Sequence, residues 1–146
     1  MLPLEAAIAP QLKVAGFRKK ARTWWRNVDE AIQVVNLQKS PYGERLYVNL
    51  GVYLTRLGPE TSPPENRCHV QARLERVADP ARWAAISSAE VGAAPPQSLL
   101  DAVLVDGLAW LNDLSTLAGI RKYIESRGTG KGLDIATVRQ LVSVAE

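Results

Sequence analysis

The chain of 146 residues has a single cysteine and a single histidine, Cys68 and His69. One cysteine cannot form an internal disulfide, and these two residues are too few for a thiolate zinc cluster or a histidine pair on a metal. Because neighbouring strand residues point to opposite faces, Cys68 and His69 are not expected to act as a catalytic dyad. We therefore expect no metal and no cofactor, and the scarcity of cysteine fits a cytoplasmic protein.

Long hydrophobic runs are also missing. The N-terminal stretch "MLPLEAAIAPQLKVAGF" has no basic segment ahead of an apolar one, and Pro3 and Pro10 interrupt it. We therefore expect neither a secretion signal nor a membrane span. Carboxylates are absent from residues 13–26, although the net charge of the whole chain is only +3. That segment is a local basic strip that carries Lys13, Arg18, Lys19, Lys20, Arg22 and Arg26.

What is present predicts a mixed fold. Helical spacing of apolar residues indicates a first helix over 4–15, which Gly16 ends. Strand-like segments follow at 17–26, 31–40, 45–54 and 68–77, and the short turns between the first three favour antiparallel hairpins. Helices are predicted after Asp79, over 98–114, over 116–126 and over 134–145. We expect one α+β domain over 1–146, with an N-terminal helix, a four-stranded antiparallel meander and C-terminal helices packed on one face.

Asparagine is depleted in strands, yet it stands in the middle of both central strands. Side chains alternate along a strand, so burying the apolar sets, such as Val35 with Leu37 and Cys68 with Val70, puts the polar sets on the opposite face. Gly51 would leave a dent in that face. The residues there that we predict to bind a partner or ligand are Asn36, Gln38, Tyr47, Asn49, Tyr53, His69 and Arg73. The alternative is an ordinary solvated face of an antiparallel sheet.

The segment "FRKKARTWWR" mixes cations with aromatic residues, a pattern typical of nucleic-acid surfaces. If it is one strand, alternation places one set on a single face: Arg18, Lys20, Arg22, Trp24 and Arg26. The alternative is an edge strand whose Lys and Arg residues prevent aggregation between sheets. The later segment "GTGKG" (128–132) lacks the spacing and the terminal Lys-Ser/Thr of a phosphate loop, so we interpret it as a connecting loop.

The combination of "GFRKKARTWWR", "NLQKS" and "VNLGVYL" resembles a widespread bacterial family, the domain of unknown function 4304 family. The resemblance covers residues 12–54 in specific motifs and the rest in general pattern. It implies a small single domain and supplies no activity, cofactor or catalytic residue. The positions by which such domains look alike are Gly16, Phe17, Lys20, Asn36, Gln38, Ser40, Asn49 and Gly51.

From these patterns we predict a non-enzymatic binding module that uses the polar face of its sheet to hold a protein segment or a small polar ligand. One version is an immunity-type protein that neutralises a toxin, which rests on analogy between folds. The first alternative is nucleic-acid binding through the strand at 17–26. The second is a small enzyme with His69 or Tyr53 as acid or base, which lacks evident catalytic partners.

Overall fold

The computed structural model describes residues 1–127, so the predicted helix at 134–145 and the "GTGKG" segment lie outside the described residues. The chain begins with helix α1 (Pro3–Val14), whose buried side Leu4, Ile8 and Leu12 follow helical spacing. Gly16 then has a φ of +98°, in the left-handed region that glycine adopts without strain after a helix. The prediction of a first helix ended by Gly16 is confirmed.

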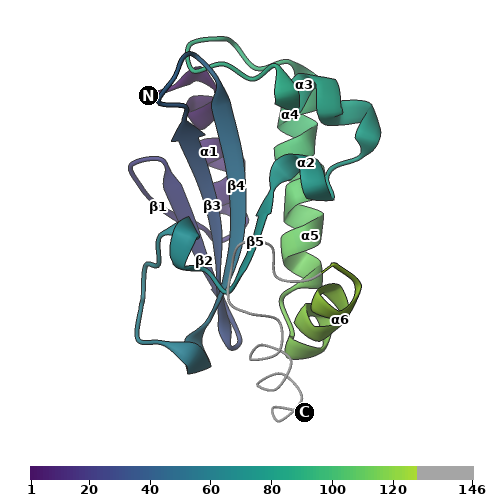
Figure 1. The fold of residues 1–146 in the computed structure, drawn as a ribbon. Helices are drawn as coiled ribbons and strands as arrows, with labels where there is room; N and C mark the ends of the chain where they lie inside the picture. Colours follow the sequence, from purple (N-terminus) through teal and green to yellow (C-terminus); the bar gives the residue numbers. More distant parts are fainter. Residues whose placement is uncertain (128–146) are drawn as a thin grey trace.

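The sheet is a five-stranded antiparallel meander in the order β1-β2-β3-β4-β5 (Figure 1). The α+β prediction is confirmed, but the number of strands was wrong. The segment 17–26 is not one strand, because Ala21 has a φ of +53° and the chain turns back there. The five strands are β1 (Arg18–Lys20), β2 (Thr23–Val28), β3 (Ala31–Lys39), β4 (Leu46–Leu54) and β5 (Val70–Arg73).

The helices after the sheet pack on one of its faces. The predicted strand at 68–77 ends early, since Leu74 begins a helical turn, α2 (Leu74–Val77). Asp79 accepts a hydrogen bond from the Ala81 N–H and caps η3 (Pro80–Arg82), which leads into α3 (Trp83–Ser87). A continuous helical run follows through α4 (Gln97–Asp101), the π-helical η4 (Ala102–Gly107) and α5 (Leu108–Asp113), and α6 (Leu117–Arg127) comes last.

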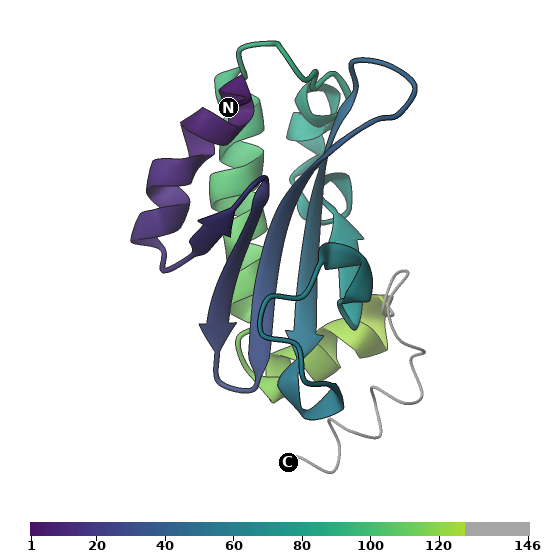
Figure 2. The same ribbon diagram turned by 90° about the vertical axis from the view of Figure 1, so that its left-hand side faces the viewer.

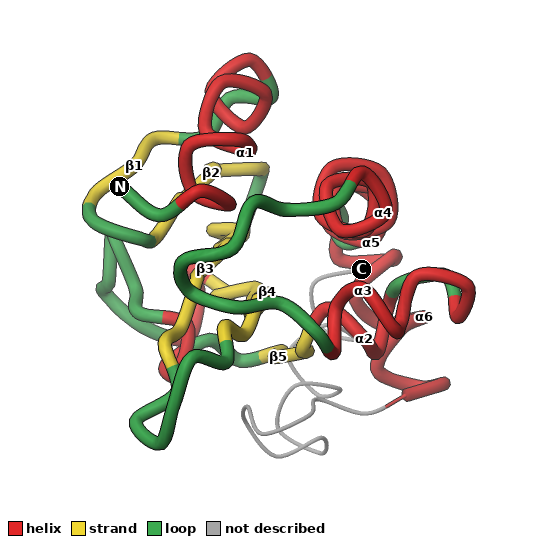
Figure 3. Tube along the Cα trace, turned by 90° about the horizontal axis from the view of Figure 1, so that it is seen from above, coloured by secondary structure: helices red, strands yellow, loops and turns green. Residues whose placement is uncertain are grey.

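The main core lies between this helical layer and the sheet (Figure 3). It contains α1 residues, the unbroken apolar set of β4 and the buried side of the run from α4 to α5. The helix backbone comes close to the sheet at Gly107, where an added Cβ would lie 3.8 Å from the Leu50 Cδ1. Within residues 1–127 no single helix is long and apolar enough to span a membrane; only the bent pair Gln97–Asp113 and Leu117–Arg127, taken together, has the length and composition.

Candidate functional site

The register of the strands builds the polar face in rows. One row crosses all five strands, because each of its residues lies opposite the next: Lys20, Thr23, Asn36, Asn49 and Arg73. Beside it, Gln38 lies opposite Tyr47. We call these seven residues the open rows. The prediction that both asparagines share one face, opposite the apolar set of β4, is confirmed; a role in binding stays a prediction.

Amide side chains link the open rows across the strands. The Asn49 Nδ2 donates hydrogen bonds to the Asn36 Oδ1 at 3.2 Å and to the Gln38 Oε1 at 2.9 Å. The Asn36 Nδ2 in turn donates to the Thr23 Oγ1 at 2.9 Å. Asn49 is only 4% exposed. It therefore acts as an internal support that orients Asn36 and Gln38, and it offers little surface of its own.

Tyr47 lies between two arginines. The Arg73 guanidinium carbon is 3.8 Å from the centroid of the Tyr47 ring, and that of Arg45 is 4.9 Å from it. Such cation–π contacts hold a flexible arginine in place over the ring. Gln38, Arg73 and Lys20 are exposed, and none of the open-row residues is acidic. The rows therefore present amide groups in the middle and positive charge at both ends.

The other half of the face is covered by residues 55–67, which we call the covering loop. It contains η1 (Thr55–Leu57) and η2 (Glu65–Arg67), and Figure 2 shows it crossing one part of the sheet face while the remainder stays open. The Trp25 Nε1 donates to the Pro63 carbonyl at 2.7 Å, and Arg18 donates to the Thr61 carbonyl and the Ser62 Oγ. The loop is therefore anchored on the β1–β2 side of the sheet.

Beneath the loop lies a second, small apolar cluster formed by Trp25, Ile32, Val34, Tyr53 and Cys68. The prediction that Cys68 joins the helix side was wrong, because η2 precedes it and the alternation of β5 begins only at Val70. Cys68 instead fills the dent at Gly51, where an added Cβ would lie 2.7 Å from the Cys68 Sγ. Burial raises the pKa of the Cys68 thiol, which makes it an inert packing group.

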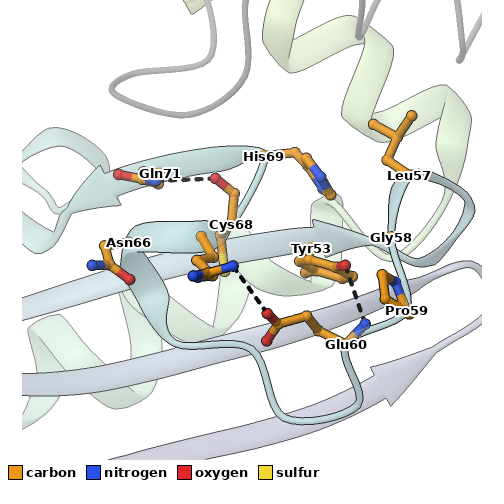
Figure 4. Close-up of a pocket in the computed structure, with 10 residues that line it drawn as sticks. Tyr53, Leu57, Gly58, Pro59, Glu60, Asn66, Cys68, His69 and Gln71 are labelled. Atoms are coloured by element: carbon orange, nitrogen blue, oxygen red, sulfur yellow. Dashed lines mark hydrogen bonds and ion pairs between the residues drawn. The ribbon is translucent and has the colours of Figure 1, made fainter.

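An open pocket of about 520 Å³ lies between the covering loop and the start of β5 (Figure 4). Tyr53 and His69 form one wall, with ring centroids 4.6 Å apart. The His69 Nδ1 accepts a hydrogen bond from the Leu54 N–H at 2.8 Å, and burial lowers the pKa of His69; both favour the neutral ring. Tyr53 and His69 were predicted to bind a partner or ligand together with residues of the open rows. The structure places them apart from these rows, in the pocket.

The predicted nucleic-acid set is also divided, and its placement on one face was wrong. The turn at Ala21 reverses the chain, which puts Trp24 on the helix side at 1% exposure. Arg26 is on the same side, where it donates to the Gln33 Oε1 at 2.7 Å and the Ala15 carbonyl at 3.1 Å. Arg18 holds the covering loop. Of the five residues, only Lys20 belongs to the open rows.

Sequence reasoning missed the polar group inside the main core. Gln33 is fully buried there, and its Nε2 donates to the Leu111 carbonyl. The Arg26 Nη2 also donates to the Asn112 Oδ1 at 2.9 Å, so this group joins β2 and β3 to α5. The sequence pattern did contain a sign of this group. Gln33 has the same parity as Val35, so alternation places its side chain on the apolar face. Among the described residues, no three His, Cys, Asp or Glu side chains are placed to hold a metal ion.

A family model described as "Domain of unknown function (DUF4304)" matches residues 8–101. The chain belongs to the DUF4304 family. The match runs from α1 to the end of α4, so the DUF4304 region contains the whole sheet, the open rows and the covering loop. No curated protein and no solved structure matches the chain.

Proposed function

We propose that this DUF4304 chain is a binding module whose open rows hold an acidic, extended segment of a protein partner. The observation that supports this most is the row from Lys20 to Arg73, which is polar in every strand, has a cation at each end and contains no carboxylate. Complementary charge of this kind speeds encounter and fixes orientation more than it adds raw affinity.

The dimensions favour a protein segment. Neighbouring strands lie about 4.8 Å apart, so five strands give the row a length of about 19 Å. An extended chain advances about 3.3 Å per residue, so about six residues would reach from one end to the other. Small-molecule sites are concave, whereas the open rows form part of a sheet surface. A partner with acidic residues near both ends of such a segment would face Lys20 and Arg73.

Tyr47 and Arg73 are the residues we expect to contribute most to the affinity. Tyrosine and arginine are enriched among residues that dominate binding energies, and the ring of Tyr47 fixes the position of the Arg73 guanidinium. Gln38 lies next to them, and Asn49 accounts for one of its hydrogen bonds. An acidic side chain that reaches the Arg73 guanidinium beside the Tyr47 ring would therefore pair with an arginine that has little freedom left to lose.

The remaining predicted functions have less support. An immunity-type role would require the acidic partner to be a toxin, and the open rows select for acidity alone. Nucleic-acid binding loses its stacking residue, because Trp24 is buried. An enzyme that used His69 as a base would need a carboxylate on the His69 Nδ1 to orient the ring, and that nitrogen instead accepts the Leu54 N–H.

A crosslinking experiment tests the proposal. The full chain would carry a photo-reactive residue at Gln38 or, as a control, at the exposed Lys122 of α6, and crosslinked proteins would be identified in cells of the source organism. We expect a protein adduct at position 38 that is absent at position 122. Arg73→Glu should lower its yield about tenfold, equivalent to about 1.4 kcal/mol, whereas Lys122→Glu, with the same change in charge, should leave it unchanged.

Three outcomes would contradict the proposal. The first is the same set of adducts at both positions, and the second is an adduct at position 38 that Arg73→Glu does not weaken. The third is salt-sensitive binding of random DNA or RNA that Arg73→Glu abolishes, which would show that the cations of the open rows serve phosphates.

A further inference from the structure

We propose that the pocket between the covering loop and β5 binds a small neutral molecule that carries an amide or carbonyl oxygen. This site is separate from the open rows, and it does not depend on the acidic protein partner. It is lined by Tyr53, by residues 57–60 of the covering loop, by residues 66–69 and by Gln71.

Two buried side chains supply hydrogen-bond donors to the pocket. Because the His69 Nδ1 accepts the Leu54 N–H, the hydrogen of the neutral ring is on Nε2, and that N–H has no partner within residues 1–127. The Tyr53 hydroxyl oxygen accepts the Glu60 N–H at 3.2 Å, which leaves its own hydrogen to donate. Tyr53 is 4% exposed and His69 is 9% exposed, so packing holds both donors in place.

The charges and the hydrogen-bond donors around the pocket together favour a neutral acceptor over an ion of either sign. The carboxylates of Glu60 and Glu65 are close enough to contribute to the raised pKa of the buried Cys68 thiol, and the same negative potential disfavours an anionic ligand. Arg67 offsets Glu60 through a loose ion pair of 3.5 Å. A cation gains from that potential, but it accepts no hydrogen bond, so the Tyr53 O–H and the His69 Nε2–H would stay unpaired beside it. A neutral acceptor meets neither penalty.

The walls of the pocket suit a flat, partly apolar molecule. Leu57 and Pro59 line it next to the tilted pair of Tyr53 and His69 rings (Figure 4). The backbone of Gly58 passes against the Tyr53 hydroxyl so closely that an added Cβ would collide with it. A side chain at position 58 would therefore displace the Tyr53 hydroxyl. A substitution of Gly58, which lies outside the β-strands, should thus destroy the site.

The test uses three probes of nearly equal shape and different charge: benzamide, benzoate and benzylammonium. Each would be titrated into the full ¹⁵N-labelled chain, with backbone amide shifts as the measurement. We expect benzamide alone to shift the signals of Leu54, Glu60 and His69. Tyr53→Phe removes one donor, and His69→Asn withdraws the other, because the shorter side chain does not reach the position of the His69 Nε2; each should weaken benzamide binding about tenfold. The asparagine retains an oxygen that can accept the Leu54 N–H.

Controls separate a lost site from a lost fold. Gln38→Ala in the open rows should leave benzamide binding unchanged, while Gly58→Ala should abolish it and keep the amide spectrum of the helices. The proposal is overturned if benzoate or benzylammonium binds as well as benzamide, or if no probe binds. It is equally overturned if both donor variants, shown to be folded by their spectra, bind benzamide as the unaltered chain does.

Discussion

The two halves of one sheet face are built differently. In the open rows, polar side chains bond to one another and stay partly accessible, whereas a few residues further along the same strands Trp25, Ile32 and Val34 are buried beneath the covering loop. The strands are continuous through both halves, so the backbone is not what distinguishes them. The difference shows that alternation assigns a side chain to a face, while a distant loop decides whether that part of the face is surface or interior.

The largest effect is expected where the loop is anchored. Trp25→Ala removes a buried ring and the hydrogen bond to the Pro63 carbonyl, and it should lower the free energy of unfolding by about 3 to 5 kcal/mol. Trp25→Phe keeps most of the ring and should cost about 1 to 2 kcal/mol. Urea denaturation measures both. If Trp25→Ala cost no more than a surface substitution, the covered half would not be a second core.

A smaller effect should follow from filling the dent at Gly51. Gly51→Ala forces Cys68 away from the sheet, and overpacking of this kind costs about 1 to 3 kcal/mol. Gly43→Ala is the matched control, because an added Cβ at Gly43 has no atom within 4 Å. Thermal unfolding of the two variants compares them directly, and equal melting temperatures would show that Cys68 does not rest on Gly51.

Asn49→Ala tests the open rows. It removes hydrogen bonds to Asn36 and Gln38 from a nearly buried position, so we expect a loss of stability of about 1 to 2 kcal/mol. Gln38→Ala, at an exposed position of the same rows, should change stability by less than about 0.5 kcal/mol. Urea denaturation of both variants checks this, and a reversed order would mean that Gln38 is the support and Asn49 the contact residue.

The smallest change is expected from pH. Burial lowers the pKa of His69 in the folded chain, so the unfolded chain takes up a proton at a higher pH than the folded chain does. Stability should therefore be complete above about pH 6.5, the ordinary histidine value, and decline as pH falls through the lower folded pKa. Because His69 is the only histidine, His69→Asn should flatten the profile between pH 7 and 5.5. An unchanged profile would show that groups other than His69 cause the pH dependence of stability.

Much of the fold could be predicted because it depends on local patterns. The alternation in β4 identified the buried face, and the helical stripes identified α1 and the run from α4 to α5. The division of residues 17–26 into β1 and β2 could not be predicted in this way, since alanine is not a residue type that commonly adopts a positive φ. Cys68 was misplaced for a similar reason, because the turn of η2 shifts the alternation just before β5.

The covered half was predictable in part. Ile32 and Val34 have the same parity as Asn36, so the predicted polar face contained apolar residues that required a cover. What the cover would be could not be predicted, because it depends on contacts between Trp25 and a loop nearly forty residues later in the chain. The pocket depends on the same loop, which is why Tyr53 and His69 were grouped with the open rows.

On the β1–β2 side, the covering loop is held mainly through its main chain. Trp25 bonds to the Pro63 carbonyl and Arg18 to the Thr61 carbonyl, and the Ser62 Oγ adds a side-chain contact there. At the start of the loop, Thr55 and Arg56 bond to Glu30. Every amino acid supplies a carbonyl oxygen, so this attachment tolerates changes of residue type at Thr61 without losing its hydrogen bond. Related chains could accordingly diversify the lining of the pocket by drift in the loop sequence, while the sheet, its helical layer and the open rows remain under separate constraints.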